Sequence, residues 1–204
     1  MAPANQTITG LDAAGNSTAN TLTFAADTGS PVIANTDLRI APVGNTTTPG
    51  FITQGGQYYV YANAADALSG IGSVTANVNA ITTGQTAVPL VAGSYAVGSV
   101  TYGYRSATLT ANASLGQGNK NYTGTATDRV GQFKKTPNAV VVVDNTAPTG
   151  SITGPTAGAT VPASATVTAS SADAKGVYSA QLQYSVAGAG VSSGMGINLK
   201  IVGE

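Results

Sequence analysis

The stretch TDRVGQ at residues 127–132, followed by VVVVDNTAP at residues 140–148, decides how this chain is organised. The same pair of signals occurs earlier, as LDAAGN at residues 11–16 and LTFAADTGSP at residues 22–31. The two turn aspartates are separated by 128 − 12 = 116 positions and the two prolines by 148 − 31 = 117. Two markers that keep nearly one offset indicate an internal repeat of a single domain length.

The repeat divides the 204-residue chain into three predicted parts. Residues 28–145 form one complete domain, which is long enough to bury its own core. Residues 1–27 are interpreted as the last hairpin of a preceding repeat, and residues 146–204 as the first three strands of a following one. The strands expected in that last part are residues 151–153, 165–169 and 179–184.

Short alternating runs rich in Thr, Val and Tyr, broken by Gly, Pro, Asn and Asp, predict an all-β chain. The clearest strands are residues 58–64 and 73–78, in which every second residue is apolar and should point into a core. The residues expected to point inward are Tyr58, Val60, Ala62, Val74, Ala76 and Val78.

Residues 121–126 and 139–143 flank the turn at residues 127–132 and are predicted to pair as a hairpin. The run of four valines in the second strand predicts burial on both faces, because nothing in it alternates. Tyr102 and Tyr104 are two positions apart in another short strand and are expected to share one face.

The succession YVYA at 59–62, Asp66 and GI at 70–71, then TATDRVG at 125–131 and VDNTAP at 143–148, resembles the bacterial and archaeal Ig-like repeats of large cell-surface adhesins. The resemblance implies an Ig-like Greek-key β-sandwich with strands A–G, one complete domain flanked by incomplete Ig-like segments. The Asp-x-x-Gly turn would join F to G. An extracellular, cell-surface location is also implied.

Tyr122 lies near the start of the expected strand F. The resemblance gives it the role of a corner tyrosine, whose hydroxyl bonds to nearby backbone. The alternative is a plain half-buried strand residue, and the sequence leaves both open.

Composition excludes several classes of function. Eight Lys and Arg balance eight Asp and Glu, so no basic face is available for nucleic acid. The chain contains no run of 18 apolar residues, so insertion into a membrane is not expected. Histidine and cysteine are absent, which removes the Ser-His-Asp triad, thiol catalysis and the usual zinc ligands. We therefore expect no enzyme, no catalytic residue and no cofactor.

The aspartates occupy turn contexts, where a carboxylate accepts backbone N–H bonds and closes its own turn. The residues expected in this role are Asp12, Asp27, Asp66, Asp128, Asp144 and Asp173. Calcium is the one metal to weigh, because a linker aspartate could approach an aspartate in the following loop. The weak calcium candidates are Asp27 with Asp66, and Asp144 with Asp173.

For three other chemistries, a plain structural role of the same residues is the better interpretation. A lysine–asparagine crosslink needs a buried lysine, whereas the lysines lie in turns, polar runs or near the terminus. The nine tyrosines could stack on glycans, but they are also the main bulky residues available for packing. Acceptor sequences for N-glycosylation occur by chance in such a chain, and here they fall at Asn5, Asn16, Asn45, Asn112 and Asn121.

The sequence supports a non-catalytic structural module of a tandem Ig-like surface or adhesion protein, serving as a stalk or adhesive shaft. The alternative is a self-assembling extracellular filament subunit, joined head to tail by strand complementation between residues 5–27 and 148–204. Exposed strand edges on the Leu22 and Phe24 side would then bind identical subunits rather than neighbouring Ig-like domains. A second alternative is a carbohydrate-binding accessory module.

Overall fold

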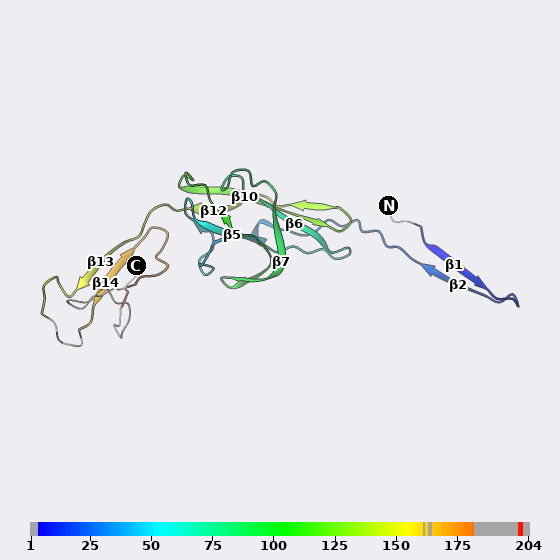
Figure 1. Ribbon diagram of the computed structural model, residues 1–204, viewed down its shortest axis with the longest axis horizontal. Coiled ribbons are helices and arrows are strands. Elements are labelled where there is room, and N and C mark those ends of the chain that lie inside the picture. The colour runs from blue at the N-terminus through cyan, green and yellow to red at the C-terminus, as the bar shows by residue number, and fades with distance from the viewer. Residues whose placement is uncertain (1–3, 161, 163–164, 182–199, 202–204) are drawn as a thin grey trace. The chain divides into compact units, whose positions relative to one another are not determined.

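A computed structural model describes residues 4–160, 162, 165–181 and 200–201 (Figure 1). Contacts divide the chain into two units, residues 1–143 and residues 144–204. The described residues are almost entirely strands, turns and extended segments, and the one short helix among them is the 3-10 helix η1 (Asn35–Asp37).

Ten strands of the first unit are joined by hydrogen bonds, eight of them in one continuous path and two at its side. Its order is β3-β5-β8-β7-β6-β10-β12-β4, with β9 paired to β5 and β11 paired to β10. The bounds are β3 (Leu38–Pro42), β4 (Phe51–Ile52), β5 (Gln57–Ala62), β6 (Ile71–Asn77), β7 (Val88–Val97), β8 (Val100–Ser106), β9 (Leu109–Thr110), β10 (Gly118–Asp128), β11 (Phe133–Lys135) and β12 (Ala139–Val143).

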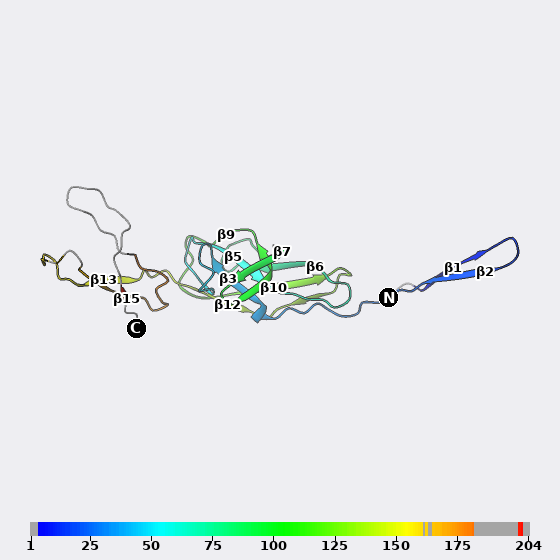
Figure 2. The ribbon, with the colours of Figure 1, turned by 90° about the horizontal axis from the view of Figure 1, so that it is seen from below.

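This path folds over into two layers that enclose one core, as can be followed in Figures 1 and 2. One layer holds β3, β5, β8 and β7, and the other holds β6, β10, β12 and β4. Lettered in chain order, the layers read A-B-E-D and C-F-G, which is the strand order of an Ig sandwich. β4 completes the second layer by pairing parallel to β12. The predicted all-β, Ig-like sandwich is therefore confirmed.

Alternation along the strands builds the core. In β5 and β6 every second side chain belongs to one buried cluster, because successive residues of a strand point to opposite faces. The phenol of Tyr58 is kept inside by a hydrogen bond of 2.7 Å between its hydroxyl and Thr82 Oγ1. The inward-facing residues predicted from the pattern are all confirmed, namely Tyr58, Val60, Ala62, Val74, Ala76 and Val78.

A second, smaller cluster lies around Tyr61 and Tyr102, separate from the main core. The Arg105 guanidinium stands 4.4 Å from the ring centroids of both Tyr59 and Tyr95, so it is held between two aromatic faces. Four of the tyrosines on β5, β7 and β8 are therefore used in packing within this cluster, namely Tyr59, Tyr61, Tyr95 and Tyr102.

The expectation that Tyr102 and Tyr104 share a face is wrong. Tyr102 belongs to the second cluster, whereas Tyr104 packs against the main core. The β7–β8 register shifts at this point: two residues of β7, Gly93 and Ser94, stand opposite Gly103 alone, so the regular pleat of the pair is interrupted between Tyr102 and Tyr104.

Two expectations about the valine run also need correction. Val141 and Val143 are fully buried but Val140 is 46% exposed, so β12 is buried on one face only. The turn after β10 leads into β11 rather than directly into the valines, and β12 pairs with the first half of β10. Pro137 lies between β11 and β12 and has no N–H to donate, so the last strand is split there.

Tyr122 is 3% exposed in the main core. Among the described residues its hydroxyl forms no hydrogen bond to the backbone, so the corner-tyrosine role is not supported. Burial raises the pKa of this phenol well above its usual value. Tyr122 is a packing residue.

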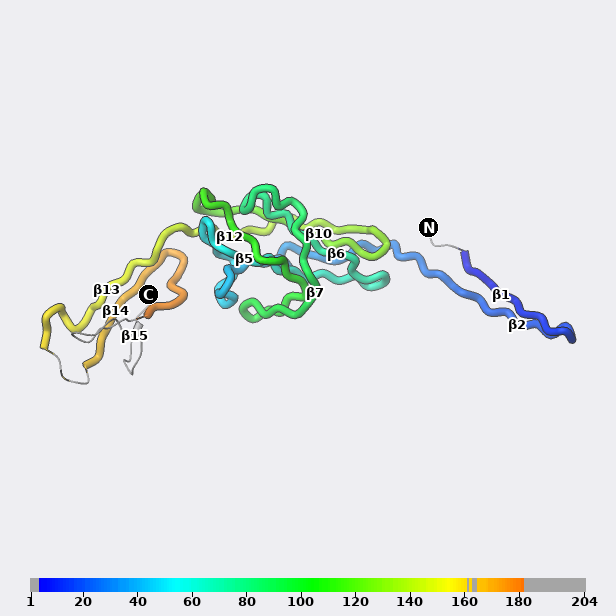
Figure 3. Tube along the Cα trace, in the orientation of Figure 1, coloured from blue at the N-terminus to red at the C-terminus, as the bar shows by residue number. Residues whose placement is uncertain are grey.

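The other strands form small sheets, which Figure 3 traces along the chain. β1 (Gln6–Leu11) and β2 (Ser17–Leu22) pair with each other, and the expected hairpin is present. In the second unit β13 (Thr149–Gly154) pairs antiparallel to β14 (Thr168–Ala172), and β14 pairs parallel to β15 (Lys200–Ile201). The strand expected at residues 179–184 is not formed at 179–181, and residues 182–184 lie outside the described part.

Gly72 offers a test of how closely β6 approaches the end of β10. Its register opposite Thr127 and Asp128 shifts, and a Cβ on Gly72 would lie 2.7 Å from the Asp128 carbonyl oxygen. Because that neighbour is backbone, Gly72→Ala is expected to lower the free energy of unfolding by about 1–3 kcal/mol. Gly116→Ala, which meets nothing within 4 Å, is the control in urea denaturation. Equal stability of both variants would contradict this close approach.

Candidate functional site

The turn between β10 and β11 is closed by the side chain of Asp128. One carboxylate oxygen, Oδ1, accepts the N–H groups of Val130 at 2.9 Å and Gln132 at 2.8 Å. Gly131 completes the turn with a φ of 92°, a conformation that glycine adopts without strain. Asp128 is only 3% exposed, so the carboxylate closes this turn from inside the protein.

The loop between β5 and β6 is closed in the same manner by Asp66. Its Oδ1 accepts the N–H groups of Leu68 at 3.2 Å and Gly70 at 2.9 Å. The loop touches the Asp128 turn directly, because the Arg129 N–H donates to the Gly70 carbonyl at 3.1 Å. These two loops are therefore held together by backbone contacts at one end of the sandwich.

The segment that leads into the domain, residues 27–32, is called the incoming segment. It brings a third carboxylate, that of Asp27, to the same place. Asp27 accepts the Gly29 N–H at 2.9 Å through Oδ1 and the Ser69 N–H at 3.0 Å through Oδ2. Its backbone carbonyl accepts the Gln132 side-chain amide at 2.9 Å. The Ser69 side chain, followed by the Gly29 N–H, lowers the pKa of Asp27, which is therefore ionised at neutral pH.

Asp27, Asp66 and Asp128 thus form a carboxylate cluster. One oxygen from each lies within 4.8 Å of the other two. The second oxygen of Asp128, Oδ2, is buried and has no hydrogen-bond partner. Buried carboxylate oxygens are normally paired, since an unpaired one forfeits its hydration without compensation.

No salt bridge reaches the carboxylate cluster from the residues that the structure describes. The Arg129 guanidinium is near Gly70, where a Cβ would lie 3.7 Å from its Nη1, but it pairs with none of the three aspartates. Like charges this close repel one another unless a cation lies between them. The arrangement therefore favours a bound positive ion.

The donor set indicates which ion would fit. Calcium binds carboxylate and carbonyl oxygens at about 2.3–2.6 Å, so two oxygens on one calcium stand at most about 5 Å apart. The spacing within 4.8 Å meets this condition. Zinc prefers nitrogen and sulfur ligands, and the chain has no histidine or cysteine. Magnesium demands shorter, near-octahedral geometry and keeps most of its waters. Calcium is the best match.

The structure places the predicted aspartates as follows. All six turn carboxylates accept backbone N–H groups, as expected: Asp12, Asp27, Asp66, Asp128, Asp144 and Asp173. The calcium candidates Asp27 and Asp66 come together, whereas Asp144 and Asp173 belong to no group of three in the described chain. Sequence reasoning missed Asp128 as a possible ligand, because the turn motif already accounted for it.

Other candidate chemistries find structural uses. Four tyrosines are at most 4% exposed and cannot stack on a glycan, namely Tyr58, Tyr61, Tyr102 and Tyr122. Lys134, Lys135 and Lys175 are exposed, which does not suit a crosslink. Two of the glycosylation candidates stabilise loops, because Asn45 accepts the Thr47 N–H and Asn112 accepts the Thr83 N–H.

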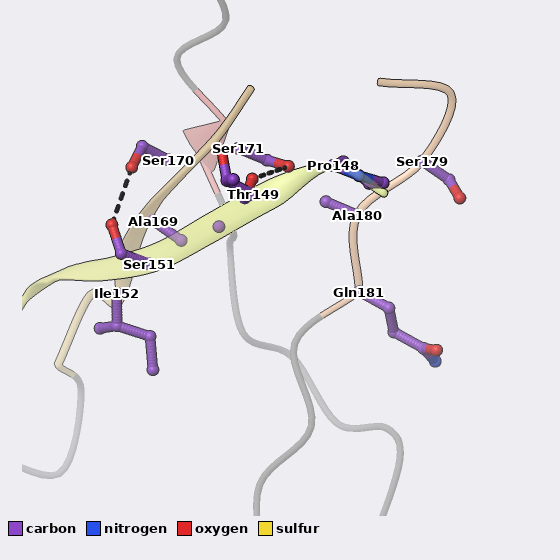
Figure 4. Close-up of a pocket in the computed structure, with 11 residues that line it drawn as sticks. Pro148, Thr149, Ser151, Ile152, Ala169, Ser170, Ser171, Ser179, Ala180 and Gln181 are labelled. Atoms are coloured by element: carbon purple, nitrogen blue, oxygen red, sulfur yellow. Dashed lines mark hydrogen bonds between the residues drawn. The ribbon is translucent and has the colours of Figure 1, made fainter. Parts of the chain in front are cut away.

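The second unit has a hollow between β13, β14 and residues 179–181 (Figure 4). Most of its lining side chains are small, with Ile152 and Gln181 the larger ones, and the Ser151 and Ser170 hydroxyls are hydrogen-bonded across the β13–β14 pair at 3.0 Å. None of the lining residues is acidic or basic. The lining that the structure describes therefore offers no group for acid–base chemistry.

The fold and the carboxylate cluster together define a class: an Ig-type β-sandwich whose incoming segment meets two acidic loops. No protein-family model and no curated protein matches the chain. Among the described residues, no helix has the length and apolar character needed to cross a membrane.

Removing the charge of Asp128 tests the repulsion within the carboxylate cluster. In chelator, the free energy of unfolding of Asp128→Asn is expected to lie between the wild-type value and about 1 kcal/mol above it. The amide oxygen still closes the turn, and the repulsion from the other two carboxylates is removed. Asp128→Ala is expected to lose about 1–2 kcal/mol, because two N–H groups lose their acceptor. Urea denaturation in EDTA measures both. A loss in Asp128→Asn as large as in Asp128→Ala would show that the turn requires the charge.

Proposed function

We propose that the chain is a non-catalytic structural module of a tandem Ig-like surface or adhesion protein, used as a stalk or adhesive shaft at the cell surface. The recurrence of one turn carries this proposal. In the Asp12 turn and in the Asp128 turn, Oδ1 accepts the N–H groups two and four residues on, at 2.9 and 2.8 Å in each. Two copies of the same turn, one domain length apart, support a tandem architecture.

A stalk requires stiff joints between its modules, and the incoming segment of this domain is fastened along its length. Val32 and Ala65 exchange backbone hydrogen bonds of 2.7 and 3.1 Å. Pro31, just before this pair, is buried and fixes the local backbone. Asp27 adds its contacts with Ser69 and Gln132. The joint is therefore built into the domain rather than left as a free linker.

We propose that calcium completes this joint. An ion bound by Asp27, Asp66 and Asp128 would connect the incoming segment to both loops and offset their mutual repulsion. Water and backbone carbonyls would supply the remaining oxygens. The calcium clamp, as we name this site, makes the stiffness of the joint depend on the cation.

Pulling on the two ends of the full chain tests the stalk function. The central domain is expected to unfold in one reproducible event and to release roughly 400 Å of chain at most. Calcium should raise the unfolding force relative to chelator, because it ties Asp27 to the body of the domain. Asp66→Asn should remove the calcium effect and keep the loop, since its amide oxygen can still accept N–H groups.

Asp37→Asn is the matched control, because Asp37 is a carboxylate of the same domain outside the carboxylate cluster. It should retain the full calcium effect. A chain that extends without a reproducible force event would rule out a load-bearing module. A reproducible unfolding force that is the same in calcium and in chelator would support the load-bearing module and contradict the calcium clamp.

The filament alternative has one specific observation in its favour. The β1–β2 ribbon exposes apolar side chains, with Ile8 77% exposed and Leu22 60% exposed. Both lie on one face of the ribbon, since Ile8 pairs with Asn20 two positions from Leu22. Ile152 on β13 is 61% exposed as well. Apolar strands of this kind can add to a sheet of another molecule.

Light scattering across a range of concentrations tests this alternative. If subunits join through the ribbon, the molar mass of the wild type rises with concentration. Leu22→Asp should then stay monomeric up to a concentration at least tenfold above the one at which the wild type assembles. Phe24→Asp should act similarly. Ala19→Asp adds the same charge to the other face of β2 and should still assemble. A wild type that stays monomeric throughout excludes the filament.

A further inference from the structure

The two copies of the aspartate turn share the aspartate and the glycine, and one of the positions at which they differ carries a side-chain amide in both. The residue four places after the aspartate is Asn16 in the first copy and Gln132 in the second. The Asn16 side-chain amide donates to Asp12 Oδ2 at 2.8 Å, so both oxygens of Asp12 are occupied. Asp128 Oδ2 receives no such bond and is buried without a partner.

The extra methylene of glutamine explains the difference. The Gln132 backbone N–H binds its own turn aspartate, as the Asn16 N–H does, at 2.8 Å. Its longer side chain then reaches past the turn and donates to the Asp27 carbonyl at 2.9 Å. The amide that would occupy Asp128 Oδ2 is thereby used to hold the incoming segment.

We propose that Gln132 is the positioning residue that determines whether the turn aspartate is available to a cation: glutamine leaves Oδ2 free, and asparagine closes it. This inference rests on the calcium clamp proposed above. The Asp12 turn is the closed form and the Asp128 turn the open form of the same motif. One methylene group then separates a purely structural turn from a ligand-bearing one.

The decisive comparison is between Gln132→Asn and Gln132→Ala in the full chain. Both lose the bond to the Asp27 carbonyl, but only asparagine can reproduce the Asn16 geometry and cover Asp128 Oδ2. Calorimetric titration with calcium chloride should give a dissociation constant for Gln132→Asn about 10–100-fold weaker than for Gln132→Ala. In EDTA, Gln132→Asn should melt about 3–6 °C above Gln132→Ala, because it pairs a buried oxygen.

The outcomes separate this inference from the clamp itself. If the wild type binds calcium and both variants weaken equally, the bond to Asp27 matters and closure by asparagine is overturned. If the wild type shows no calcium binding, the clamp is wrong. The melting temperatures in EDTA still decide on closure in that case, because equal melting of the two variants would overturn it.

Discussion

A carboxylate has two oxygens, and the end of this domain depends on how Asp128 uses them. One oxygen closes the β10–β11 turn, which brings that turn into contact with the loop of Asp66. The other is buried among like charges with no partner. Gly72 permits this arrangement, because any larger residue would push β6 away from the Asp128 backbone. The turn, the neighbouring loop and the incoming segment therefore share one electrostatic constraint.

Most of the fold could be predicted from the sequence because alternation is a local property. Tyr58, Val60 and Ala62 had to face one way in any strand, and the core confirms this. The failures come from non-local features. The valine run was expected to be buried on both faces of its strand. A sandwich layer has a single inner face, however, and Val140 lies on the outer one. The β7–β8 register shift, which lies opposite the step from Tyr102 to Tyr104, has no clear signal in the residues themselves.

The carboxylate cluster was half predictable for the same reason. Asp27 and Asp66 are conspicuous because one lies in a linker and the other in the loop expected beside it. Asp128 was hidden by its own motif, since a turn aspartate accounts for itself through local N–H bonds. Only tertiary burial reveals that its second oxygen lacks a partner. The available signal was the residue four places on, where Gln132 replaces the asparagine of the first turn.

Charge is scarce in this chain, with eight acidic residues in 204, yet three of them meet within 4.8 Å. Scattered carboxylates would close the same turns without mutual repulsion, as Asp12 does on an exposed hairpin. The cluster therefore weakens the cation-free joint and strengthens the cation-bound one. A module with the proposed calcium clamp would add a cation-dependent part to the stiffness that its backbone contacts already give the joint. Such a device would suit the tandem protein proposed above if its joints have to be firm only where calcium is abundant.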